Sequence, residues 1–93
     1  MSKIPMSDML ATLSSYQAQA LDKCIDFELG LHFNDKKVPY ADVKLYCSVA
    51  IGDNVETHMF TTTISEDYCT SKNNNRMEKV KDFIQTTTLY SEK

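Results

Sequence analysis

Residues 25–33, with the sequence Ile-Asp-Phe-Glu-Leu-Gly-Leu-His-Phe, decide the fold because apolar and polar side chains alternate along them. Successive side chains of a β-strand point to opposite faces of a sheet, whereas a helix would scatter these apolar groups around its circumference. The stretch therefore predicts a strand with its apolar side chains toward a core. On the polar side, Gly30 is expected to face Tyr46 and to leave room for that ring.

Two further strands are predicted after the first. Residues 34–39 are rich in turn formers, and residues 43–51 then repeat the alternation. The segment 52–54, Gly-Asp-Asn, tolerates positive φ and is typical of a hairpin turn. Residues 55–64 are rich in threonine, which suits a half-buried strand. The three strands are expected to form an antiparallel meander.

The inward face of the third strand depends on the turn before it, because a slip of one residue exchanges the two faces. A two-residue turn at Asp53-Asn54 would bring His58, Phe60 and Ile64 inward. We favour this alternative, because Phe60 and Ile64 have the larger apolar surface. A three-residue turn would instead bring inward the alternate set, which is Val55, Thr57, Met59 and Thr61.

A helix is predicted on each side of the strands. Over residues 7–22 apolar side chains recur at intervals of three and four, with Ser7 as N-cap and Asp8 near the positive end of the helix dipole. The segment 65–74 is polar and is expected to be a loop. A second helix is predicted over residues 76–86, with Asn75 and Glu78 as a capping box.

The expected fold is a single small α+β domain over residues 1–93. Its elements follow the order α-β-β-β-α, with a three-stranded antiparallel meander and both helices on one face, because each element has one apolar side. The core is expected to span about residues 7–86, with frayed ends. The uncovered sheet face would then present to solvent the side chains of Asp26, Glu28, His32, Lys44, Tyr46 and Ser48.

Composition limits the classes of function. The chain has 93 residues and a net charge of −3, and residues 1–71 contain ten acidic and five basic side chains. An acidic body repels phosphate, so nucleic-acid binding is disfavoured. No run of 18 apolar residues or secretory signal is present, so we expect no membrane contact. The three cysteines form no disulfide framework, which favours a cytoplasmic location.

No catalytic, metal or cofactor site is predicted. The cysteines and histidines lack metal-ligand spacing, and two glycines are too few for a phosphate-binding loop. The alternative is a cysteine-dependent enzyme that uses Cys69, with His58 nearby only if a loop folds back onto the third strand.

Three surface features are candidates for binding. The first is the acidic sheet face, formed by Asp26, Glu28, Tyr46 and Ser48, as a partner-binding site. The second is a set of basic residues with nucleic-acid or protein partners: Lys36, Lys37, Lys72, Arg76 and Lys79. The third is an uncovered edge strand, which offers backbone groups to a partner strand or to a second copy, so that a homodimer is possible.

The α-β-β-β-α order over residues 7–86 is similar to that of the double-stranded-RNA-binding domain. This resemblance implies RNA contacts from the first helix, from Lys36 and Lys37 in the first hairpin loop, and from the start of the second helix. The family's Gly-Pro-x-His loop is replaced here by residues 34–39, and its lysine cluster is reduced to a spaced set, Lys72, Arg76 and Lys79.

The sequence favours a small acidic non-catalytic protein that binds another protein. Compact inhibitors carried by phages and mobile elements are of this kind, and some present carboxylates where a host partner expects nucleic-acid phosphates. A diverged RNA-binding module is the second hypothesis, and a small cysteine-dependent enzyme is the third.

Overall fold

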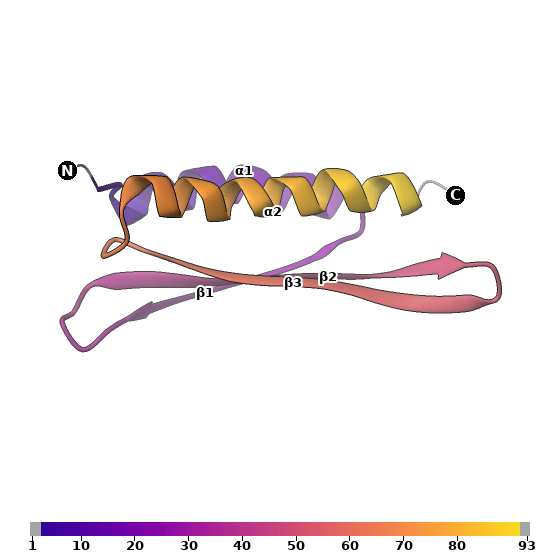
Figure 1. Cartoon of the computed structure of the whole chain (residues 1–93), viewed down its shortest axis with the longest axis horizontal. Coiled ribbons are helices and arrows are strands. Elements are labelled where there is room, and N and C mark those ends of the chain that lie inside the picture. The colour runs from indigo at the N-terminus through magenta and orange to yellow at the C-terminus, as the bar shows by residue number, and fades with distance from the viewer. Residues whose placement is uncertain (1–2, 92–93) are drawn as a thin grey trace.

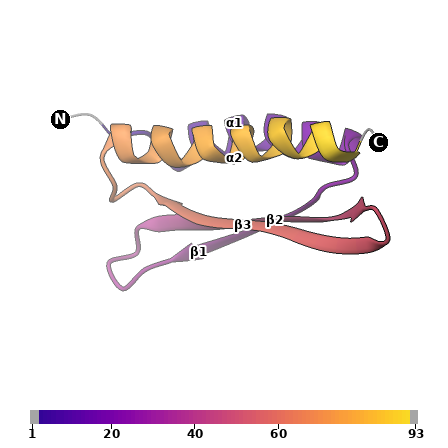
Figure 2. The same cartoon turned by 45° about the vertical axis from the view of Figure 1, so that its right-hand side comes forward.

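The computed structural model describes residues 3–91, without the side chains of Ile51 and residues 88–91, and it has the expected α+β architecture (Figure 1). Both helices lie side by side over one face of a three-stranded antiparallel sheet of order β1-β2-β3. The turned view in Figure 2 shows the same two layers. The elements are α1 (Met6–Asp22), β1 (Asp26–Phe33), β2 (Pro39–Ile51), β3 (Asn54–Ser65) and α2 (Thr70–Ser91).

The change from helix to strand occurs at Cys24, which adopts a left-handed conformation with φ 60°. The N–H of Ile25 donates to the carbonyl of Ala20 at 2.9 Å, and the N–H of Cys24 donates to the carbonyl of Leu21 at 3.3 Å. This pair of bonds is a Schellman motif, which satisfies the last carbonyls of α1 and turns the chain into β1. The predicted end of the helix and start of the strand are thus confirmed.

The N-terminus of α1 differs from the prediction. Pro5, and not Ser7, is the N-cap residue, and it makes no side-chain cap bond. Glu66, in the loop after β3, accepts a hydrogen bond from the N–H of Met6 at 2.6 Å. A carboxylate at this end satisfies an orphan N–H and opposes the helix dipole. The cap therefore comes from 60 residues away.

The two hairpins fix the register of the sheet. Residues 35–37 form the β1–β2 turn, in which Lys37 has φ 66° and its N–H donates to the carbonyl of Asn34 at 2.9 Å. The β2–β3 turn has two residues, Gly52 and Asp53, since Ile51 pairs with Asn54. Gly52 has φ 61°, as a glycine at the first loop position of a tight hairpin allows.

The predicted inward face of β3 is confirmed, although the turn lies one residue earlier than expected. His58 pairs with Cys47, Phe60 with Leu45, and Ile64 with Ala41. Moving both turn residues by one shifts the register by two, which preserves the faces. The expected pairing of Gly30 with Tyr46 is wrong: Gly30 pairs with Asp42, because β2 begins at Pro39 rather than at residue 43.

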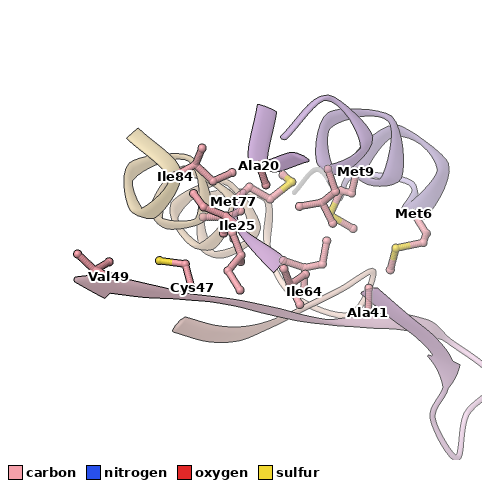
Figure 3. Close-up of a cluster of buried hydrophobic side chains, with 14 residues drawn as sticks. Met6, Met9, Ala20, Ile25, Ala41, Cys47, Val49, Ile64, Met77 and Ile84 are labelled. Atoms are coloured by element: carbon pink, nitrogen blue, oxygen red, sulfur yellow. The ribbon is translucent and has the colours of Figure 1, made fainter. Parts of the chain in front are cut away.

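The core lies between the two layers (Figure 3). Leu45 on β2, Leu13 on α1 and Val80 on α2 are fully buried in this core. The apolar face of β1 is covered only in part, because Leu31 and Phe33 remain 51% and 64% exposed. Leu21, counted in the apolar stripe of the first helix, is also exposed.

The second helix is longer than predicted and its cap is different. α2 starts at Thr70, with a first turn in which the N–H of Asn73 donates to the carbonyl of Cys69 at 3.1 Å. The capping box of Asn75 and Glu78 is therefore wrong, since both lie inside the helix. Polar Asn73 and Thr87 are buried on the same stripe as the apolar residues of the helix. Met6 is buried as well, so the core extends beyond both expected limits, 7 and 86.

Candidate functional site

One face of the sheet is uncovered within the part of the chain that the structure describes, because both helices pack on the other (Figures 1 and 2). We call this surface the open face. Its side chains come from alternate positions of the three strands. They are Asp26, Glu28, His32, Tyr40, Asp42, Lys44, Tyr46, Ser48, Ala50, Val55, Thr57, Met59, Thr61 and Thr63.

The predicted acidic residues lie together on this face. Asp26 pairs with Tyr46 across the strands, and the hydroxyl of Tyr46 donates to Glu28 Oε2 at 3.0 Å. This hydrogen bond and the negative charges of Glu28 and Asp26 raise the pKa of Tyr46. The ammonium of Lys44 lies 5.3 Å from the centroid of the Tyr46 ring. Ser48 follows on the same face, beyond the start of β1.

A second polar cluster lies nearer the β1–β2 turn, and the sequence interpretation missed most of it. Asp42 Oδ2 is 3.5 Å from His32 Nε2, and Asp42 Oδ1 accepts a hydrogen bond from Thr63 at 2.9 Å. The ring of His32 lies 5.3 Å from that of Tyr40. His32 also lies over Gly30, where an added Cβ would meet its Nε2 at 3.0 Å. Extending the alternation of β2 back to Pro39 would have found Asp42.

Two exposed apolar side chains add to the open face. Val55 and Met59, both on β3, are 71% and 57% exposed. Met59 pairs directly with Tyr46, so an apolar group lies beside the Tyr46–Glu28 pair. The open face therefore combines carboxylates, an aromatic ring and uncovered aliphatic groups. A sequence reading could have found them only with the hairpin register fixed.

The basic residues lie mostly at one end of the molecule, where two of them pack on one tyrosine ring. Lys36 and Lys37 are in the β1–β2 turn, at the same end as the start of α2 (Figure 1). Lys72 Nζ is 3.8 Å from the centroid of the Tyr68 ring. Arg76 contacts the same ring and also donates to the carbonyl of Thr63 at 2.7 Å. RNA binding through this set stays a prediction.

Lys79 lies one turn further along α2 than Arg76, and the two side chains line the same pocket beside β3. Lys79 also lines a neighbouring pocket with His58, Phe60 and Phe83. Phe60 and Phe83 stack there with ring centroids 6.1 Å apart. Within the spaced basic set, Lys72 and Arg76 therefore share the Tyr68 ring, and Arg76 and Lys79 share a pocket.

The structure does not bring Cys69 and His58 together. Cys69 precedes the first turn of α2, where its thiol lies 3.4 Å from the hydroxyl of Ser71. That contact, with the backbone N–H of Lys72, lowers the pKa of the Cys69 thiol. His58 lies beside residues 82–87 of the same helix, about 20 Å further along at 1.5 Å per residue.

The other two cysteines differ in burial. Cys24 is exposed, and Cys47 is buried on β2, where burial and the charge of Asp26 raise the pKa of its thiol. Within residues 3–91, no three His, Cys, Asp or Glu side chains lie close enough to hold a metal ion. No helix in this range is long and apolar enough to cross a membrane.

Comparison with known proteins gives no match: no family model fits the chain, and no curated protein or solved structure is significantly similar to it. The α-β-β-β-α order that resembles the double-stranded-RNA-binding domain is present in the structure.

Proposed function

We propose that this protein is a small binding protein that contacts another protein through its open face. The observation that supports the proposal is the one-sided packing of the sheet: both helices lie on one face, and the other face keeps an organised set of polar and apolar side chains. A large sheet face with uncovered aliphatic groups is typical of an interaction surface.

The composition of the open face indicates the chemistry of the partner. Tyr46 and Met59 are residue types enriched at the centres of protein interfaces, and they are cross-strand neighbours here. The open face carries three carboxylates, from Asp26, Glu28 and Asp42, against one ammonium from Lys44. Such a surface complements a basic protein surface.

A basic protein surface of this kind is also where a nucleic acid binds, so the protein would act as an inhibitor that replaces phosphates with carboxylates. Phage and mobile-element inhibitors of host proteins provide the biological setting for this proposal. The acidic body of the chain supports it, because the long-range field attracts a basic partner and repels nucleic acid.

The test compares how much partner protein is retained by the immobilised wild-type chain and by two immobilised double variants. Asp26→Asn with Glu28→Gln removes two charges from the open face, and Glu78→Gln with Asp82→Asn removes two from the exposed side of α2. We expect wild type and the α2 variant to retain the same partner at low salt, and the open-face variant to lose it, with a loss in affinity of about tenfold or more.

Competition with nucleic acid tests whether the protein inhibits its partner by occupying a nucleic-acid-binding surface. If the partner binds nucleic acid, added duplex DNA or RNA should displace it from the immobilised chain. Equal retention by both double variants would contradict the role of the open face, and binding of duplex RNA to the isolated chain would favour the RNA-binding hypothesis instead.

A further inference from the structure

The edge strand β1 has unpaired backbone groups next to apolar side chains. β1 is at the edge of the sheet, and the N–H of Asn34 donates to the carbonyl of Val38 in register with the β1–β2 ladder. Because hydrogen bonding alternates along an antiparallel strand, the even-numbered residues of β1 bond to β2. The N–H and C=O groups that point away from the sheet belong to Phe27, Leu29, Leu31 and Phe33.

The side chains of these four residues all lie on the helix side of the sheet, and their exposure is uneven. Phe27 and Leu29 are half-buried and pack against the core, whereas Leu31 and Phe33 are 51% and 64% exposed. The start of the strand is therefore covered and its end is uncovered.

A groove lies beside the start of β1, at the other end of the strand from the exposed Leu31 and Phe33. Its walls are the flank of α1 and the first residues of β1, and its lining includes Ala18, Leu21, Ile25 and Phe27. Leu21 is 78% exposed at this groove. One end of β1 thus projects an uncovered phenyl ring, and the other end has an apolar groove along the same edge.

We infer that two copies of this chain pair through β1, antiparallel and about a two-fold axis at Gly30. In this register Phe33 of each copy lies opposite Phe27 of the other, and Leu31 lies opposite Leu29. Each exposed Phe33 would enter the groove beside α1 of the other copy, so each copy supplies both the ring and the groove. Self-complementarity of this kind is what an isologous interface requires.

The neighbouring registers fit less well. A shift that centres the axis on Leu29 would pair Phe33 with Ile25, but the N–H of Ile25 already donates to the carbonyl of Ala20 at 2.9 Å. A shift that centres it on Leu31 would pair Leu29 with Phe33 and leave the outward groups of Phe27 without a strand partner. With the axis at Gly30, all four outward residues pair with one another, and each pair exchanges two backbone bonds.

The polar side of β1 is compatible with the same register. Glu28 of one copy lies opposite His32 of the other, and Gly30 lies opposite Gly30, so that no like charges face each other directly. The paired sheet would have both open faces on one side and all helices on the other. This inference is independent of the proposed function, since it uses the opposite side of the sheet and its edge.

The first test is the mass of the full chain in solution. We expect a concentration-dependent dimer by sedimentation equilibrium up to about 0.5 mM, where even modest affinities are populated. The double variant Leu31→Lys with Phe33→Lys should raise the dissociation constant by about 100-fold or more, because each dimer loses both buried ends and gains charges there. Val55→Lys with Met59→Lys is the matched control on β3 and should leave the dimer intact.

The second test does not depend on how the lysine variants fold. Gly30→Cys, in a chain with Cys24→Ser and Cys69→Ser, places two thiols at the axis, where Cα atoms of non-hydrogen-bonded pairs are about 4.5 Å apart and can form a disulfide. The new Cβ requires only that the His32 ring rotate away. We expect oxidation to give a covalent dimer, and Thr61→Cys on β3 in the same background to give none.

Two results would overturn the inference: a chain that stays monomeric at the highest concentration, or a dimer that the β1 lysines leave unchanged. Equal cross-linking of the Gly30→Cys and Thr61→Cys chains would do the same.

Discussion

The two edge strands of the sheet are β1 and β3, and each has N–H and C=O groups that point outward, away from β2. The strands differ in whether side chains of a helix form hydrogen bonds with these outward groups. On β3, α2 bonds to the last two outward residues. Arg76 donates to the carbonyl of Thr63 at 2.7 Å, and the carboxamide of Asn73 bonds to both the N–H and the C=O of Ser65 at 3.1 and 2.8 Å. On β1, α1 packs over the apolar side chains, and no α1 side chain bonds to the backbone of residues 26–33.

This difference shows how one sheet acquires an edge that is blocked at one end, at Thr63 and Ser65, and another edge that stays available along its length. The carboxamide of Asn73 has the same donor and acceptor as a peptide group, so it takes the place of a neighbouring strand at Ser65. Natural proteins block edges in such ways to prevent unwanted pairing, and they leave free those edges that serve association. Substitutions that remove these bonds, or the rings beside each edge, should therefore affect the two strands differently.

Asn73→Leu should cost about 3 kcal/mol of the free energy of unfolding. Asn73 is fully buried, and its loss leaves the N–H and C=O of Ser65 without partners in a site closed to water. Urea unfolding followed by circular dichroism measures the effect. Asn74→Leu, the same substitution at the exposed next position, should change stability by less than about 0.5 kcal/mol.

Phenylalanine-to-alanine substitutions should lower the free energy of unfolding more on β3 than on β1. Phe60→Ala on β3 removes a ring that packs against the core and stacks on Phe83, and we expect a loss of about 2 kcal/mol. Phe33→Ala on β1 should cost less than about 0.5 kcal/mol in dilute solution, since that ring is 64% exposed. Similar losses for both variants would mean that β1 is covered in the monomer.

Arg76→Met should destabilise the protein by about 1 kcal/mol, because the charge-assisted bond to Thr63 is lost while the carbonyl can still be hydrated. Lys79→Met, at an exposed position one turn further on, is the control. Hydrogen exchange should also rise at the end of β3 in the Arg76 variant. An unchanged exchange rate there would contradict the blocking role of this side chain.

The alkylation rate of Cys69 should show whether the junction between β3 and α2 is folded. This measurement is expected to leave the stability of the protein unchanged. Because the pKa of its thiol is lowered in the folded chain, iodoacetamide should react faster at Cys69 near pH 7 than in the urea-unfolded chain. The larger thiolate fraction outweighs the smaller intrinsic nucleophilicity. Peptide mass spectrometry measures the rate, and Ser71→Ala should slow it. A rate that is equal in both states would mean that this junction is open in solution.

Much of the candidate site was predictable, because strands reveal their faces by simple alternation. Asp26, Glu28, Tyr46 and Ser48 were placed correctly on one uncovered face from the period of two alone. The contact between Tyr46 and Glu28 needed the register, which depends on the length of each turn. Asp42 was missed because Pro39 and Tyr40 were assigned to a turn rather than to the start of β2.

The second helix shows where a sequence pattern fails. Its buried stripe runs through Asn73, Met77, Val80, Ile84 and Thr87, but its first and last members are polar. A periodicity of apolar residues therefore finds only the middle of the helix. Asn73 is tolerated inside the core because Ser65 satisfies its carboxamide, and that partner is eight residues away along the chain.

The sequence by itself determined the order of elements, the apolar face of each, and the switch from helix to strand at Cys24, because these depend on local side-chain periodicity. Only the tertiary structure decided that the last two outward residues of β3 are blocked and that the outward residues of β1 are available. That outcome depends on single hydrogen bonds between distant residues, such as Arg76 to Thr63 and Asn73 to Ser65, and no local pattern encodes which backbone group a side chain will meet.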